Sequence, residues 1–280
     1  MVSPKRPELP VVSAGWLPIR HAAASAVWSR CVVPAPCNPN LLPLLWSGRI
    51  FPRKKMPNLT PDVIAIGFIW YIVFLFSTTC HEASHALAAK LGGDDTAALG
   101  GQLTLNPLPH IRREPWGMVV IPVLAFLFWQ QIIGWASAPF NPEWERRYPH
   151  RSAWMALAGP AANFTLMFLA VAAIHLGFRL DWFYSVNGVP NFPFTIVRAF
   201  FLLNLLLGVF NLLPFPPLDG STGIMALMNE STARRYMDWL RTSPYRMLGL
   251  LVALYGFRYV FDPIEIFVKK ALLGSLARFF

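Results

Sequence analysis

Charged residues are scarce in this chain of 280 residues. Asp, Glu, Lys and Arg together make up 14% of it, whereas hydrophobic residues make up 55%. A typical soluble domain carries about 25% charged residues, so this composition excludes an ordinary soluble protein and indicates a membrane protein. The expected environment is the lipid bilayer.

Cysteine is also scarce, with three residues, Cys31, Cys37 and Cys80, and no Cys-x-x-Cys pair. This count and spacing exclude a disulfide framework and a cysteine-based zinc site. Cys80 lies inside an apolar run, where we expect a buried, inert thiol.

Nucleic-acid binding is not expected either, although the net charge is +10. The basic residues form short clusters between apolar runs, as the positive-inside rule arranges them in membrane proteins. No stretch interleaves basic and aromatic residues in the way a nucleic-acid-binding surface does.

Three regions differ in composition. Residues 1–55 are rich in Pro, Ala and Arg, lack periodicity, and contain no clean apolar core of a signal peptide. We expect a disordered or spurious extension there, with Met56 as an alternative start. Residues 56–262 form the predicted core. Residues 263–280 form an amphipathic tail that either lies along the membrane surface or extends the last apolar run.

The core contains five apolar runs, at residues 63–91, 118–135, 153–178, 194–213 and 247–260. A helix needs about 20 apolar residues to cross a bilayer. The runs predict an all-α polytopic membrane protein, a bundle of about five membrane segments, and we expect it in the cell membrane as a multi-pass protein of the prokaryotic inner-membrane type. No stretch is long and polar enough to form an inserted soluble domain.

The first run contains the motif His81-Glu82-Ala83-Ser84-His85, which is HExxH. On a helix the two histidines fall on one face and can bind one metal ion, while Glu82 can take a proton from a water molecule. A catalytic zinc ion takes three protein ligands and keeps one open position. Such polar residues inside a span usually mark a function, although a polar helix–helix contact is the alternative.

Three residues are candidates for the third ligand. His175 lies in the third run, where a lone histidine is more often a satisfied interhelical contact, and His110 lies between the first two runs. Asp219 follows a proline-rich stretch that must end the fourth helix. Unwound backbone in a membrane has to line a cavity, so Asp219 is the best-placed candidate.

Together, HExxH in one run and Asn-x-x-Pro-x-x-Pro-x-Asp-Gly after a later one resemble the site-2 protease family of intramembrane zinc metalloproteases. The resemblance covers about residues 56–229. It implies Zn²⁺ as cofactor, His81, His85 and Asp219 as ligands, and Glu82 as general base.

The resemblance also assigns residues to the substrate. Asn211, which opens the second motif, would stabilise the oxyanion or hold the substrate strand, and Asn163 of a Gly-Pro-x-x-Asn element would line the substrate groove. Alternatively, Asn163 makes a polar contact between helices. The stretch 99–109 resembles the membrane-embedded strand with which these proteases pair an unwound substrate. Compact members of the family often carry His-x-Asp-Pro at the position of His110, whereas this chain reads His110-Ile111-Arg112-Arg113. No PDZ domain is recognisable in the sequence.

The function implied is cleavage of transmembrane helices of other membrane proteins, which are the expected partners. Two alternatives remain from the sequence, a membrane metal-ion transporter and a non-catalytic relative that binds membrane helices. A transporter needs no general base, so the substitution Glu82→Gln separates it from a protease.

The number of membrane crossings between the two halves of the site constrains the topology. Because His85 and Asp219 must meet one ion, the ends of the first and fourth runs lie on one side of the membrane, so one intervening run does not cross. We expect residues 118–135, which Pro122 interrupts, to dip in and return. Most arginines then share one side, which the positive-inside rule makes cytoplasmic.

Overall fold

The computed structural model describes residues 59–184, 191–244 and 246–280. All of them belong to one compact unit, Pro36–Phe280. The expectations for residues 1–55, including Cys31 and Cys37, lie outside the described residues.

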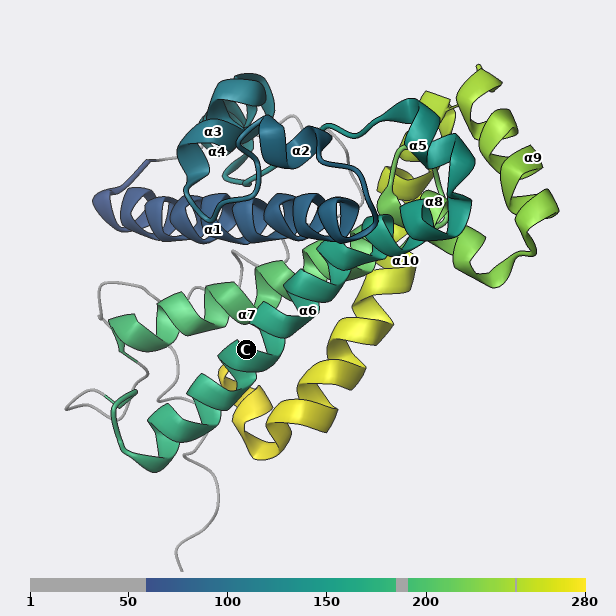
Figure 1. Cartoon of the computed structure of the whole chain (residues 1–280). Helices are drawn as coiled ribbons and strands as arrows, with labels where there is room; N and C mark the ends of the chain where they lie inside the picture. The colour runs from purple at the N-terminus through teal and green to yellow at the C-terminus, as the bar shows by residue number, and fades with distance from the viewer. Residues whose placement is uncertain (1–58, 185–190, 245) are drawn as a thin grey trace, which may run out of the picture. The chain divides into compact units, whose positions relative to one another are not determined.

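The described chain is helical (Figure 1). In order, the elements are α1 (Pro61–Leu91), α2 (Thr96–Leu99), α3 (Pro107–Arg113), η3 (Trp116–Val120), α4 (Ile121–Trp129), α5 (Pro142–Arg147), α6 (Pro149–Arg179), α7 (Phe192–Asn211), α8 (Asp219–Gly223), η4 (Ile224–Leu227), α9 (Glu230–Thr242), α10 (Arg246–Leu273) and η5 (Gly274–Phe279). Within the described ranges, four helices are long and apolar enough to cross a membrane, namely α1, α6, α7 and the stretch Met247–Phe279 that includes α10. This confirms the predicted helical membrane protein.

Helix α1 begins where Thr60 caps it by accepting a hydrogen bond from the backbone N–H of Val63 (3.4 Å). It runs for 31 residues, about 46 Å at 1.5 Å per residue, which exceeds the hydrocarbon thickness of about 30 Å. An apolar stripe repeats every four residues along one exposed face: Ile64, Phe68, Ile72 and Phe76. The face that carries this stripe is suited to lipid.

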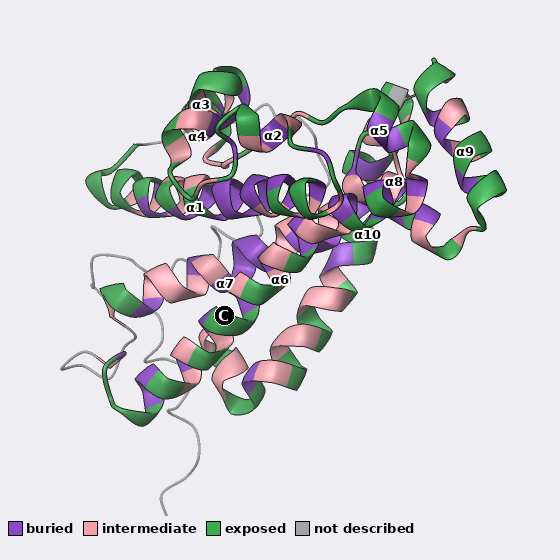
Figure 2. Cartoon of the chain, in the orientation of Figure 1, coloured by how far each residue is buried: buried purple, intermediate pink, exposed green. Residues whose placement is uncertain are grey.

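Helices α6 and α7 pack against each other and against α1. The main apolar core lies between α6, α7 and α10, and includes Met167, Ile174, Phe201, Leu205 and Phe257. Figure 2 shows buried residues concentrated along the middle and C-terminal part of α1, whereas α10 is mostly intermediate or exposed. The polar part of α1 therefore faces protein.

Helix α10 continues through Pro263 to Leu273. The tail thus extends the fifth apolar run, one of the two arrangements that the sequence left open. His175 on α6 forms a hydrogen bond through Nε2 with the carbonyl of Leu272 (2.7 Å). This is the interhelical contact predicted for that histidine.

The second apolar run forms a shorter helix than its 118–135 range suggests. It is helical from Trp116 to Trp129, about 21 Å at 1.5 Å per residue, which is too short to cross the hydrocarbon core. Gln130 ends the helix in the left-handed region (φ 56°), and its backbone N–H donates to the carbonyl of Phe126 (2.8 Å). The helix lies against α1, where the Tyr71 hydroxyl donates to the carbonyl of Met118 (3.2 Å).

After α4 the chain runs back without helix. The backbone N–H of Trp135 donates to the carbonyl of Gly117 (3.1 Å), and the Ser137 hydroxyl donates to Oε1 of Glu114 (2.5 Å). Arg113 Nε also donates to the carbonyl of Ser137 (3.0 Å). The two ends of the segment 114–137 therefore lie next to each other.

The strand expected within residues 99–109 is not confirmed. Within the described ranges no strand is assigned, and this stretch forms the end of α2, a turn at Gly100 and Gly101, and the start of α3. Residues 102–106 between the two helices adopt no regular secondary structure, and the stretch then turns into α3. Asn106 accepts a hydrogen bond from the backbone N–H of Leu108 (3.0 Å), and Pro107 occupies the first helical position, which proline favours.

Asp94 fastens the segment that follows α1. Its Oδ1 accepts from the backbone N–H (3.0 Å) and the hydroxyl (2.5 Å) of Thr96, and its Oδ2 accepts from the backbone N–H of Asn141 (2.8 Å). Burial raises the pKa of the Asp94 carboxyl, but these hydrogen bonds outweigh burial and hold the pKa below its usual value. The start of α5 is thereby tied to the end of α1.

The end of α1 also contacts the start of α6. The indole of Trp144 and the guanidinium of Arg151 each donate to the carbonyl of Gly92 (both 3.0 Å). Two side chains therefore satisfy a carbonyl at the C-terminus of α1, where helices leave such groups unpaired. The C-terminal end of α1 and the N-terminal end of α6 lie at one level.

Candidate metal centre

The HExxH motif lies in the buried C-terminal half of α1. His81, Glu82 and His85 are 6%, 4% and 8% exposed. The two histidines are four residues apart and share one face of the helix, with their ring centroids 4.6 Å apart. The motif residues are thus close together, as predicted.

Asp219 reaches the same place through the break after α7. Helix α7 ends at Asn211, a proline-containing stretch of turns follows, and α8 begins at Asp219. A Cβ on Gly220 would collide with the carbonyl of Leu212. The close return of α8 onto the end of α7 therefore requires a glycine after the aspartate.

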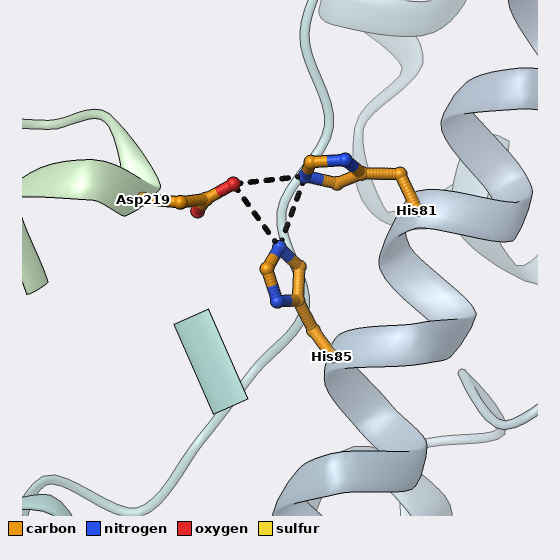
Figure 3. Close-up of side chains that lie close together, drawn as sticks. All are labelled: His81, His85 and Asp219. Carbon is orange, nitrogen blue, oxygen red and sulfur yellow. Dashed lines mark hydrogen bonds and ion pairs between the residues drawn. The ribbon is translucent and has the colours of Figure 1, made fainter. Parts of the chain in front are cut away.

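The three predicted ligands converge (Figure 3). Asp219 Oδ2 lies 3.1 Å from Nε2 of His81 and 3.5 Å from Nε2 of His85. The two Nε2 atoms are 3.0 Å apart. Two histidines of α1 and one aspartate of α8, far apart in the sequence, thus place three donor atoms around one point.

The other ring nitrogens have oxygen partners. Nδ1 of His85 lies 2.7 Å from the carbonyl of Met155, and Nδ1 of His81 lies 2.7 Å from Oδ1 of Asn163. A carbonyl oxygen can only accept, so Nδ1 of His85 carries the proton and its Nε2 presents a lone pair. Metal-binding histidines are commonly oriented in this way.

This arrangement fits a metal ion. Two imidazole lone pairs and a carboxylate oxygen face one another, and without a cation or protons between them they would repel. Two histidines and one carboxylate match the three-ligand set of catalytic zinc.

Gly159 on α6 leaves the space that an ion needs. A Cβ at this position would lie 2.5 Å from Nε2 of His81 and still nearer Nε2 of His85. The backbone of α6 therefore approaches the ligand atoms closely, and any side chain here would intrude among them.

Glu82 directly follows His81 in the motif. Its Oε2 is buried and has no hydrogen-bond partner among the described residues. A buried carboxylate oxygen without a partner is costly for a fold, so its retention indicates that water or substrate completes the site.

The structure places the two predicted substrate residues differently. Asn163 is fully buried and contacts His81, which corresponds to a polar contact between helices; its place in a substrate groove stays a prediction. Asn211 is the last residue of α7 and is partly exposed. Among the described residues, no hydrogen bond joins Asn211 to the ligands. His110 is buried and bonds through Nε2 to the carbonyl of Thr104 (3.0 Å), away from the metal centre.

Sequence reasoning missed two residues near the ligands. Gly159 opens the Gly-Pro-x-x-Asn element of the third run, but its closeness to the metal ligands was not predicted. Asn204 is fully buried and bonds to Asn163. The signal for Asn204 was present, because an amide inside the apolar run 194–213 is a functional candidate by default.

The fold and the site define a helical protein with four candidate membrane-spanning helices among the described residues and a candidate metal site of two histidines and one aspartate. Comparison with curated proteins agrees. The chain is 37% identical over 202 residues to the putative zinc metalloprotease YwhC of Bacillus subtilis, covering 68% of this chain and 81% of YwhC. It is 30% identical over 259 residues to the putative zinc metalloprotease Rip2 of Mycobacterium tuberculosis (strain H37Rv), covering 89% of this chain and 95% of Rip2.

The chain belongs to this family of zinc metalloproteases, and its cofactor is Zn²⁺. No family model matches the chain, and no solved structure matches it.

Proposed function

We propose that the chain is a zinc-dependent intramembrane endopeptidase of the site-2 protease type, which cleaves transmembrane helices of other membrane proteins in the cell membrane. One observation carries this proposal. The buried residue Glu82 directly follows the candidate ligand His81 on a helix long enough to span a bilayer, and its Oε2 has no hydrogen-bond partner among the described residues. A binding or transport site needs the ligands but has no use for this carboxylate.

The residues divide the chemistry between them. His81, His85 and Asp219 would hold the zinc ion, which would polarise the scissile carbonyl as a Lewis acid and make a water molecule more acidic. Glu82 accepts the proton of that water and returns it to the leaving amine. Asn211 donates a hydrogen bond to the oxyanion. The substrate helix has to unwind, because helical hydrogen bonds and side chains screen its peptide bonds.

We also propose that the segment 114–137 enters the membrane and returns to the same side. Its ends are joined by the hydrogen bond between Ser137 and Glu114 (2.5 Å), and its helical part is too short to cross. The bonds from Trp144 and Arg151 to Gly92 place the end of α1 level with the start of α6. Two crossings, α6 and α7, then return the chain to the side where Asp219 meets α1.

This topology places most of the arginines on one side of the membrane. The end of α3, helix α5, the start of α6 and helix α9 then share one side. They carry Arg112, Arg113, Arg146, Arg147, Arg151, Arg234, Arg235 and Arg241. The positive-inside rule makes this side cytoplasmic.

The test compares membrane proteins of cells that produce the wild-type chain or the Glu82→Gln variant. We expect new protein termini within transmembrane segments to appear in wild-type cells and to be absent with Glu82→Gln, since glutamine cannot accept the proton. The matched control is Glu143→Gln, the same substitution at an exposed position at the start of α5.

Zinc content is measured on the same purified proteins. Glu82→Gln should retain zinc, because Glu82 is not one of the three ligands. Wild-type levels of cleavage by zinc-loaded Glu82→Gln would contradict the proposal, as would zinc uptake into vesicles that is unaffected by this substitution.

A further inference from the structure

Four polar side chains form a hydrogen-bonded network across α1, α6 and α7. Ser77 lies one helical turn before His81 on α1, Asn163 lies on α6, and Asn204 lies on α7. Ser77, Asn163 and Asn204 are all 0% exposed. Its three hydrogen bonds join Ser77 Oγ to Asn204 Nδ2 (2.9 Å), Asn204 Oδ1 to Asn163 Nδ2 (2.9 Å), and Asn163 Oδ1 to His81 Nδ1 (2.7 Å).

The direction of each hydrogen bond in this network follows from one backbone carbonyl. Asn204 Nδ2 also lies 2.9 Å from the carbonyl of Phe200, which can only accept. The nitrogen of the Asn204 amide is thereby fixed toward Phe200, and its oxygen faces Asn163. Asn163 must then donate through Nδ2, which leaves its oxygen to accept from Nδ1–H of His81.

The orientation of the Asn163 amide affects metal binding through the tautomer of His81. With the proton held on Nδ1, Nε2 of His81 keeps its lone pair for the ion. If the Asn163 amide turned by half a rotation, its NH₂ group would face Nδ1, and the ring proton would move to Nε2. Zinc would then have to displace that proton before it could bind.

We propose that Asn204 is a positioning residue of the zinc centre, because it fixes the amide orientation of Asn163 and through it the tautomer of His81. The inference rests on the proposed function, because it assumes that His81 binds zinc. A role confined to holding helices together is the competing explanation, since polar groups commonly link membrane helices in this way.

The test begins with Asn204→Leu in the full chain, which removes the anchor at similar volume. Zinc affinity is measured by competition with a chelator. We expect binding to weaken by about 10–100-fold, the usual effect of losing an outer partner of a metal ligand. The matched control is Thr79→Val, which removes a fully buried hydroxyl from α1; among the described residues this hydroxyl bonds within its own helix, to the carbonyl of Leu75 (2.7 Å). It should bind zinc as the wild type does.

A rescue variant separates positioning from helix linkage. In the double variant Asn163→Asp, Asn204→Leu, a carboxylate replaces the amide, and either of its oxygens accepts from Nδ1 of His81. It therefore needs no anchor, and we expect zinc affinity to recover most of the loss. A helix-linking role predicts no recovery, because Asn163→Asp restores neither of the two hydrogen bonds that Asn204 makes to other helices, with Ser77 and with Asn163.

Two results would overturn the inference: unchanged zinc affinity in Asn204→Leu, or a double variant that binds zinc no better than the single one. Thermal unfolding without metal shows that each variant is folded. Zinc affinity and thermal unfolding can be measured without any proteolysis. A chain that binds zinc but cleaves nothing would therefore refute the proposed function, whereas the inference about Asn204 would still be decided by the zinc affinities.

Discussion

Replacing Gly159 with alanine tests the metal centre with a single methyl group. Its Cβ would lie 2.5 Å from Nε2 of His81, about 0.9 Å short of the 3.4 Å at which ordinary contact begins. The histidine rings cannot easily yield, because each is held through Nδ1 at 2.7 Å, by Asn163 and by Met155. Either α6 or the rings must therefore move by most of an ångström.

That displacement is large on the scale of metal binding. Zinc–nitrogen bonds are about 2.0–2.1 Å long and tolerate deviations of about 0.2 Å. We therefore expect Gly159→Ala to lower zinc affinity by at least the roughly 10–100-fold that changes outside the ligands cause. Any cleavage activity should fall with it, since misplacing reacting groups by about 1 Å costs about 100-fold.

The assay is zinc content and chelator competition on the purified chain. The matched control is Gly177→Ala on the same helix, where a Cβ would meet the buried ring of Phe183 instead of the ligands. It should destabilise the fold and still bind one zinc ion per chain. Wild-type zinc affinity in Gly159→Ala would refute the placement of α6 against the ligands.

Three further predictions concern the substrate, the fold and the topology. Asn211→Ala should lower turnover by about 100–1000-fold, as the loss of an oxyanion donor does, while zinc occupancy stays intact; unchanged cleavage in a reconstituted assay would remove Asn211 from the mechanism. Asp94→Asn should lower the unfolding temperature at pH 7, since a hydrogen bond to a charged group contributes about 1.5–3 kcal/mol. Because the folded pKa of Asp94 lies below its usual value, this stability is present above the unfolded pKa of 3.8 and is lost as the pH falls below it, so melting curves of wild type and variant should converge in acid. Single cysteines placed beside Arg112 and Arg147 should react with an impermeant reagent from the same side of the membrane, and labelling from opposite sides would rule out the re-entrant segment.

The long helices could be predicted from the sequence because their signal is local. The runs 63–91, 153–178 and 194–213 differ from α1, α6 and α7 by a few residues at each end, as expected when an apolar run decides where a helix lies. Run 118–135 was predicted less well. Its helix stops at Trp129, although the apolar residues continue, because Gln130 adopts a left-handed conformation and the chain folds back on Gly117.

Helix α9 (Glu230–Thr242) was not predicted at all. Its signal was present, because Asn229 caps it by accepting from the backbone N–H of Thr232 (2.9 Å), and its buried residues Ala233, Met237 and Leu240 fall on one face. A search for apolar runs passes over such a helix, because most of its residues are polar.

Some residues of the candidate site could likewise be predicted from the sequence, and others could not. His81, Glu82 and His85 could be found from spacing alone, and Asp219 from its place after a proline break. The importance of Gly159 and Asn204 could not be found from spacing, because it arises only where α6 and α7 pack against the motif on α1. Which small or amide residue of a run faces the ligands depends on the rotation of each helix, and that is set by packing between distant segments.

The most direct measurement of the central claim uses the purified, zinc-loaded chain in lipid vesicles with a set of single-span membrane proteins as substrates. Mass spectrometry in ¹⁸O-labelled water should reveal cleavage inside a transmembrane segment, with one labelled oxygen in the new carboxyl terminus. The same products should be absent with zinc-loaded Glu82→Gln and after removal of zinc. Cleavage that persists in either case, or a zinc-loaded wild-type chain that cleaves no membrane-spanning segment, would contradict the account.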